Sequence, residues 1–150
     1  MSIKETLQKD LTEAIRGRNE ITSGTIRMVL TAITNEEVAG KEARVLSDEE
    51  VITVLSREAK KRREAAEAFE TAGRTDKAAL EKSEGEVIAK YLPAQLSEAD
   101  IAAIIAEAIA STGAQGPADM GKVRGAVKPT IAGKADGGVV SALVNAALNK

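Results

Sequence analysis

The chain has 150 residues, with 21 basic and 23 acidic side chains and a formal net charge of −2. It contains no cysteine and no histidine, which excludes disulfides, thiol catalysis, zinc sites built on Cys or His, and His-based triads. One Phe, one Tyr and no Trp argue against base-stacking RNA modules, and a carboxylate-only magnesium site is the one metal chemistry left open. We expect no cofactor and no bound metal.

The start of the chain, MSIKETLQKD, is charged within its first four residues. No apolar run approaches the roughly 18 residues of a membrane-spanning helix. The sequence therefore predicts neither a signal peptide nor a membrane span, and we expect a cytoplasmic protein.

The first part of the chain shows apolar residues at three- and four-residue spacing, which is typical of amphipathic helices. Ser2 with Glu5 and Ser47 with Glu50 have the pattern of capping boxes, in which two side chains satisfy free amides at a helix start. Leu80 is predicted to be buried. The spacing predicts four helices in an antiparallel bundle, over about 3–16, 23–38, 48–71 and 76–92.

Pro93, in YLPAQLS, marks the best domain boundary, because proline disfavours helix at the residue before it. We therefore expect a helical bundle over 1–92 and a small three-helix domain over 93–150. Ser97 with Asp100 predicts a weaker cap for the first helix of that domain. The fold class is all-α throughout.

The other two helices of the second domain are predicted from their ends. Asp119 is interpreted as the N-cap of a short helix over about 119–127, which Pro129 stops. Asp136 is interpreted as the N-cap of the last helix, in preference to leaving the amides of Gly137 and Gly138 for a phosphate.

The segment 117–138 is unlike the rest of the chain, because it packs five glycines with four basic and only two acidic residues. It lacks the Ser or Thr that follows Gly-Lys in a P-loop, so a nucleotide triphosphatase is not expected. Glycine lets a backbone approach a partner closely and offers amide donors to phosphate oxygens. A solvated loop whose glycines only serve turns explains the composition equally well. The candidate nucleic-acid-binding residues are Gly121, Lys122, Arg124, Lys128 and Lys134.

A second basic run, REAKKRREAAEAF, lies on the third predicted helix. Lys60 with Glu64 and Arg63 with Glu67 have the spacing of ordinary surface ion pairs. Arg57 and Lys61 are less obviously paired. Arg62 falls near the apolar stripe, where it either extends its charge to solvent or pairs with a carboxylate of another helix. We treat Arg57, Lys61 and Arg62 as secondary candidates and favour a structural or solvated face.

Four stretches resemble the YqeY-like family, which shares a domain with the tail of GatB, a subunit of the tRNA-dependent Asp/Glu amidotransferase. ADMGKVRGAVKPTIAGKADGG is similar to the family's D-M-G-K-V-M and G-[RK]-A-D-G loop, and YLPAQLS to its Y-L-P-x-Q-L-S segment. SDEEVITVLSREAKKRREAAEAF resembles its K-x-R-x-E-S helix and TIRMVLTAITNEE its first motif. Arg124 and Val127 stand where the family often has Met, and Ala65 where it has Ser.

The resemblance implies an all-helical fold and a role in binding tRNA or another structured RNA, because the corresponding tail contacts the tRNA body away from the chemistry. It also implies a carbon-nitrogen ligase label, which would be inherited from the shared domain, since no catalytic residues are visible here. The alternative is a protein-interaction adaptor, docking Met120, Val123 and Val127 onto an aminoacylation or amidation enzyme.

Overall fold

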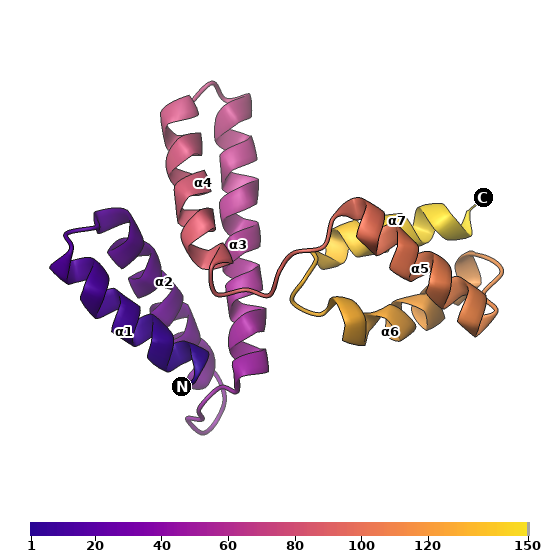
Figure 1. Cartoon of the computed structure of the whole chain (residues 1–150), viewed down its shortest axis with the longest axis horizontal. Coiled ribbons are helices and arrows are strands. Elements are labelled where there is room, and N and C mark those ends of the chain that lie inside the picture. The colour runs from indigo at the N-terminus through magenta and orange to yellow at the C-terminus, as the bar shows by residue number, and fades with distance from the viewer. Residues whose placement is uncertain (150) are drawn as a thin grey trace. The chain divides into compact units, whose positions relative to one another are not determined.

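The structure is a computed structural model that describes residues 1–149. These residues form seven α-helices and one short 3-10 helix, with no strand in the described part, which confirms the all-α fold class. The chain divides into two compact units, Met1–Leu92 and Pro93–Lys150. Four helices belong to the first unit and three to the second (Figure 1).

The first unit consists of two helical hairpins that pack together. Within it, α1 pairs with α2 and α3 with α4, while α2 also packs on α3 and α4 (Figure 1). Its core is aliphatic and includes Leu7, Ile26, Ile33, Leu55 and Ile88, each at most 1% exposed. The helices are α1 (Ile3–Arg16), α2 (Glu20–Glu37), α3 (Asp48–Thr71) and α4 (Thr75–Ala89).

The capping boxes predicted at Ser2 and Ser47 are confirmed, since each serine accepts a hydrogen bond from the glutamate amide three residues on. α2 begins three residues before its predicted start. Asn19 causes this difference, because its side chain accepts a hydrogen bond from Thr22 N at 3.1 Å and so supplies the N-cap. The pattern of apolar residues contained no signal for this polar cap.

Leu80 is 46% exposed, so the prediction that it is buried is wrong. The buried residues of α4 are Ala78, Val87 and Ile88. The start of α4 lies beside α3, whereas its later part also reaches α2 (Figure 1). A helix covered on one side buries fewer positions than its apolar pattern offers.

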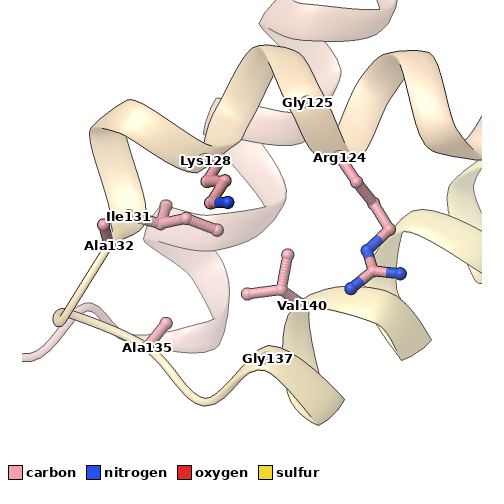
Figure 2. A pocket seen from close by; sticks show the side chains of 8 residues that line it. All are labelled: Arg124, Gly125, Lys128, Ile131, Ala132, Ala135, Gly137 and Val140. Carbon is pink, nitrogen blue, oxygen red and sulfur yellow. The ribbon is translucent and has the colours of Figure 1, made fainter. Parts of the chain in front are cut away.

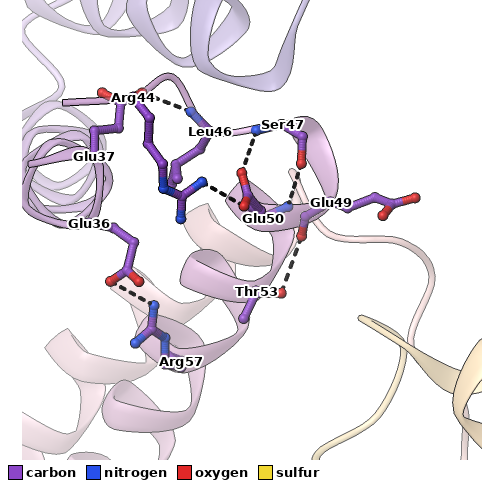
Figure 3. A network of polar contacts seen from close by, with 9 residues as sticks. All are labelled: Glu36, Glu37, Arg44, Leu46, Ser47, Glu49, Glu50, Thr53 and Arg57. Carbon is purple, nitrogen blue, oxygen red and sulfur yellow. Dashed lines mark hydrogen bonds and ion pairs between the residues drawn. The ribbon is translucent and has the colours of Figure 1, made fainter. Parts of the chain in front are cut away.

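Polar contacts fasten the link between α2 and α3. Glu37 is buried and accepts a hydrogen bond from Lys4 Nζ at 2.7 Å. It also accepts one from Leu46 N at 3.1 Å and lies next to Arg44, which pairs with Glu50 (Figure 3). The Lys4 hydrogen bond, followed by that of the Leu46 amide, lowers the pKa of Glu37. Ionised Glu37 therefore holds α1 and the connecting segment to the end of α2.

The second unit is a three-helix arrangement in which each α-helix packs on the other two. Its core includes Ile101, Ile105, Val123, Val127 and Val144, all at most 2% exposed. Ser97 and Asp100, predicted as a weaker cap, form a complete capping box. The elements are α5 (Glu98–Thr112), the 3-10 helix η1 (Pro117–Asp119), α6 (Met120–Ile131) and α7 (Gly137–Leu148).

Two predictions about α6 are wrong. The helix passes through Pro129 and ends at Ile131, because the proline costs one backbone hydrogen bond near the end while Ile131 is buried in the core. Asp119 occupies the N-cap position but its carboxylate accepts a hydrogen bond from Gln115 N at 3.0 Å, and it caps no amide of α6. The cap predicted at Asp136 is confirmed by its bond from Gly138 N.

Candidate nucleic-acid interface

The candidate site is the outer face of α6, which is basic because of how the helix packs. Val123, Val127 and Ile131 recur every fourth residue and are buried against the core. Lys122, just before Val123, and Arg124 and Lys128, between the buried positions, are exposed. No acidic residue lies within Met120–Ile131. The helix therefore presents three positive charges to solvent.

These cations have no carboxylate partner. Among residues 1–149, Lys122, Arg124 and Lys128 form no side-chain hydrogen bond or ion pair, and the same holds for the side chain of Lys134. Arg124 and Lys128 are four residues apart on one helix, a spacing at which like charges repel by about 0.2–0.5 kcal/mol. The four basic residues predicted for this segment are thus free to meet an anion.

Lys134 lies in the short connection between α6 and α7, which the start of the second unit holds in place. Gly133 has a φ of +75°, a conformation that favours glycine, and it turns the chain after α6. Lys134 O accepts a hydrogen bond from Leu96 N at 2.9 Å, and Gly133 O accepts one from Gln95 Nε2 at 3.0 Å. The backbone of this connection is fixed while the Lys134 side chain is half-buried.

The predicted Gly-rich loop is mostly helix. Gly121 and Gly125 are residues of α6, and a Cβ at either would meet open space. Neither glycine is therefore required by a turn or by crowding inside the unit. A close approach of a partner to the α6 backbone at Gly121 stays a prediction.

α6 and α7 border an open pocket of about 340 Å³. Arg124 extends from α6 toward α7 and lies beside Val140, and Lys128 lies near Ile131 on the same side of α6 (Figure 2). Gly125 and Gly137 complete the opposing walls, and no acidic residue lines the pocket. Sequence analysis missed this pocket, because residues of α6 and α7 that lie side by side carry no local pattern that relates them.

The secondary candidates on α3 are all paired. Arg57 contacts Glu36 of α2 at 3.3 Å (Figure 3), and Lys61 contacts Glu58 at 3.2 Å. Arg62 is only 10% exposed, and donates to Glu58 Oε2 at 2.7 Å. These contacts match the structural interpretation that we favoured for this helix.

Arg62 also confirms the predicted pairing with a carboxylate of another helix. Its Nε lies 3.4 Å from Glu84 Oε2 on α4, an ion pair without the geometry of a hydrogen bond. Burial, with Glu81 nearby, raises the pKa of Glu84, and the Arg62 charge opposes this shift. The guanidinium therefore holds together α3 and α4 and is not available to a ligand.

Two of the three residues of the apolar docking face that we considered for a protein partner are buried. Val123 is 0% exposed and Val127 2% exposed, while Met120 is half-buried and packs against the same core. The expectation that Val123 and Val127 dock onto a partner is wrong, since they stabilise the second unit instead, and docking through Met120 stays a prediction.

No helix among residues 1–149 is long and apolar enough to cross a membrane. Within the same residues, no three acidic side chains gather where they could hold a metal ion.

Known proteins resemble this chain in sequence. It is 32% identical over 91 residues to "Altered inheritance of mitochondria protein 41, mitochondrial" of Clavispora lusitaniae, covering 61% of this chain and 52% of that protein. It is 30% identical over 97 residues to an uncharacterized protein of Schizosaccharomyces pombe, covering 64% and 76%. The chain thus spans about half the length of the Clavispora relative.

The family comparison extends over nearly the whole chain. A sequence model described as "Yqey-like protein" matches residues 4–148, which cover nearly all of both units and lack only the first residue of α1 among the seven α-helices. The basic helix, the pocket and the paired cations of α3 all lie within the match. The chain therefore belongs to the YqeY-like protein family.

Proposed function

We propose that this protein binds tRNA or another structured RNA, and that the second unit makes the contact. The observation that carries the proposal is a set of basic side chains on and after α6 that have no carboxylate partner among residues 1–149: the exposed Lys122, Arg124 and Lys128, and the half-buried Lys134. Unpaired cations gain most from meeting phosphates, because they give up no internal ion pair and they release counterions from the RNA.

The distribution of aromatic residues favours contacts with the RNA backbone. Phe69 and Tyr91 are the only Phe and Tyr of the chain, and both lie in the first unit. Residues 93–150 therefore have no aromatic ring on which a base could stack. Recognition of structured RNA by shape and by its phosphates needs no such rings.

The proposal includes a relationship between this chain and the tail domain of the amidotransferase subunit GatB. In that enzyme the tail contacts tRNA while other domains perform the chemistry, and this chain is proposed to retain only the contact. A carbon-nitrogen ligase activity would require those other domains. The sequence predicts a cytoplasmic location, and the name of the Clavispora relative contains the word mitochondrial. Both compartments contain tRNA.

The test is binding of the purified chain to bulk tRNA across a salt series. Four phosphate contacts give a log–log slope of roughly −3 to −4, so affinity should fall about 60- to 250-fold between about 50 and 200 mM salt. The variant with Lys122, Arg124, Lys128 and Lys134 all replaced by alanine should bind weakly and with a flat slope. Absence of binding at low salt, or identical curves for both proteins, would refute the proposal and redirect the search to protein partners.

A further inference from the structure

The pocket between α6 and α7 has a character that phosphate binding leaves unexplained. Its walls are apolar at Ile131 and Val140 and bare at Gly125 and Gly137, and only the side chains of Arg124 and Lys128 bring charge. A site for phosphate alone is built from amides and cations. An apolar wall instead favours an uncharged ligand group, because moving such a group from water to an apolar surface is favourable.

The geometry favours one flat group held beside an anion. Arg124 and Lys128 lie four residues apart, about 6 Å along the helix axis, and both line the pocket. The Arg124 side chain extends from α6 toward Val140 in the first turn of α7, and Lys128 lies nearer to Ile131 (Figure 2). A planar guanidinium can cover one face of a base while an aliphatic side chain covers the other. The ammonium of Lys128 is then placed for a neighbouring phosphate.

The size of the pocket restricts the occupant. About 340 Å³ lies at the small end of the roughly 300–1,000 Å³ found for small-molecule sites, so one nucleotide fits and a stacked helix does not. In a duplex the base faces are covered by their neighbours. Only an unpaired nucleotide, in a loop, a bulge or a single strand, can offer its base to such a pocket.

We infer that the α6–α7 pocket receives the base of one unpaired nucleotide, between the Arg124 guanidinium and Val140, while Lys128 contacts an adjacent phosphate. This inference rests on the proposed function and extends it. The basic face of α6 supplies affinity for any RNA, and the pocket selects RNA with an unpaired residue within reach.

The experiment fills the pocket without changing a charge. Gly125→Leu places a side chain on the pocket wall, where a Cβ meets open space and the backbone φ is not positive. Gly137→Leu fills it from α7, where a Cβ also meets open space, so the test does not depend on one variant folding. Gly24→Leu, in α2 of the first unit, is the matched control because its Cβ is equally unobstructed.

Each full-length protein is titrated with a short oligouridylate, which has little structure of its own, and with a blunt RNA duplex of equal charge. We expect either pocket variant to weaken oligouridylate binding about tenfold while duplex binding changes less than about twofold. Gly24→Leu should bind both RNAs as the wild type does. Shifted NMR signals of Val140 on addition of uridine monophosphate would place the base in the pocket.

The outcomes separate the inference from the proposed function. Unchanged oligouridylate binding by both pocket variants, or equal losses on both RNAs, would overturn the inference and leave RNA binding by α6 standing. Failure of the wild type to bind either RNA would overturn both. Val140 signals that respond to hexanoate and not to uridine monophosphate would show a pocket for an aliphatic carboxylate, and would also overturn it.

Discussion

α3 and α6 both carry runs of basic residues, but only those of α6 are left without partners. On α3, Arg57 and Arg62 meet carboxylates from α2 and α4, and Lys61 meets Glu58 of its own helix. On α6, Arg124 and Lys128 meet none within residues 1–149. A run of basic residues therefore indicates an anion-binding surface only where the fold leaves those residues without carboxylate partners.

The difference originates in the neighbouring helices. α3 lies beside α2 and α4, which supply Glu36 and Glu84 at contact distance. α6 lies beside α7, whose twelve residues carry no charged side chain, and beside α5, whose acids do not reach the α6 cations. The first unit uses its charges to hold helices together, while the second unit is held together by apolar packing.

The largest expected effect is on tRNA affinity, in a comparison of two variants that each replace four cations with alanine. Replacing Lys122, Arg124, Lys128 and Lys134 should abolish the steep salt dependence of tRNA binding. Replacing Arg57, Lys60, Lys61 and Arg63 removes the same number of charges from α3 and should leave tRNA affinity within about threefold of wild type at about 150 mM salt. Equal losses in the two variants would show that net charge, not the α6 face, drives binding.

Breaking the buried cluster of α3 should produce the largest loss of stability. Arg62→Met keeps the volume but leaves Glu58 and Glu84 without their shared cation, so the free energy of unfolding should fall by about 3–5 kcal/mol. Lys61→Met, at the exposed neighbour, should cost less than about 1 kcal/mol. Urea unfolding followed by circular dichroism measures both. Equal values would mean that Arg62 does not hold α3 to α4.

The charge contacts of the first unit should also make its stability depend on pH. The pKa of Glu37 is lower in the folded chain than in the unfolded one, so its contribution is complete above the usual glutamate pKa of about 4.3 and is lost as the pH falls through the folded value. The stability difference between wild type and Glu37→Gln should therefore be largest near neutral pH and shrink in acid.

The adjacent variant is the control for this pH series. Glu36 forms an exposed ion pair with Arg57, so Glu36→Gln should give only a small difference in stability at neutral pH. A Glu37→Gln variant that matches the wild type at neutral pH would contradict the role of ionised Glu37 at the link between α2 and α3.

The smallest expected effect is on stability, when an unpaired cation of α6 is removed. Because Lys128 makes no ion pair with residues 1–149 and is repelled by Arg124, Lys128→Ala should change the free energy of unfolding by no more than about 0.5 kcal/mol in either direction. Thermal unfolding of the variant beside wild type checks this. A loss of more than about 1 kcal/mol would mean that this lysine has a structural role in the second unit.

The features that could be predicted from the sequence are those decided by interactions between residues close together in the chain. Helical periodicity, the capping serines and the Asp136 cap follow from neighbours within a few residues, and so these features were predictable. Leu80, Pro129 and Asp119 were predicted wrongly because burial, core packing and the Gln115 amide decided each of them. The pocket depends on which residues of α6 and α7 meet, and a single sequence does not encode that in any local pattern.

Pro129 has a consequence for the backbone of α6 as well as for its length. Because proline has no N–H, the carbonyl of Gly125, four residues earlier, does not receive the hydrogen bond that a helix normally supplies. Gly125 also lines the pocket, and its missing side chain leaves that stretch of main chain uncovered. The main chain of α6 thus contains, at the pocket, a carbonyl that receives no hydrogen bond from the residue four positions on.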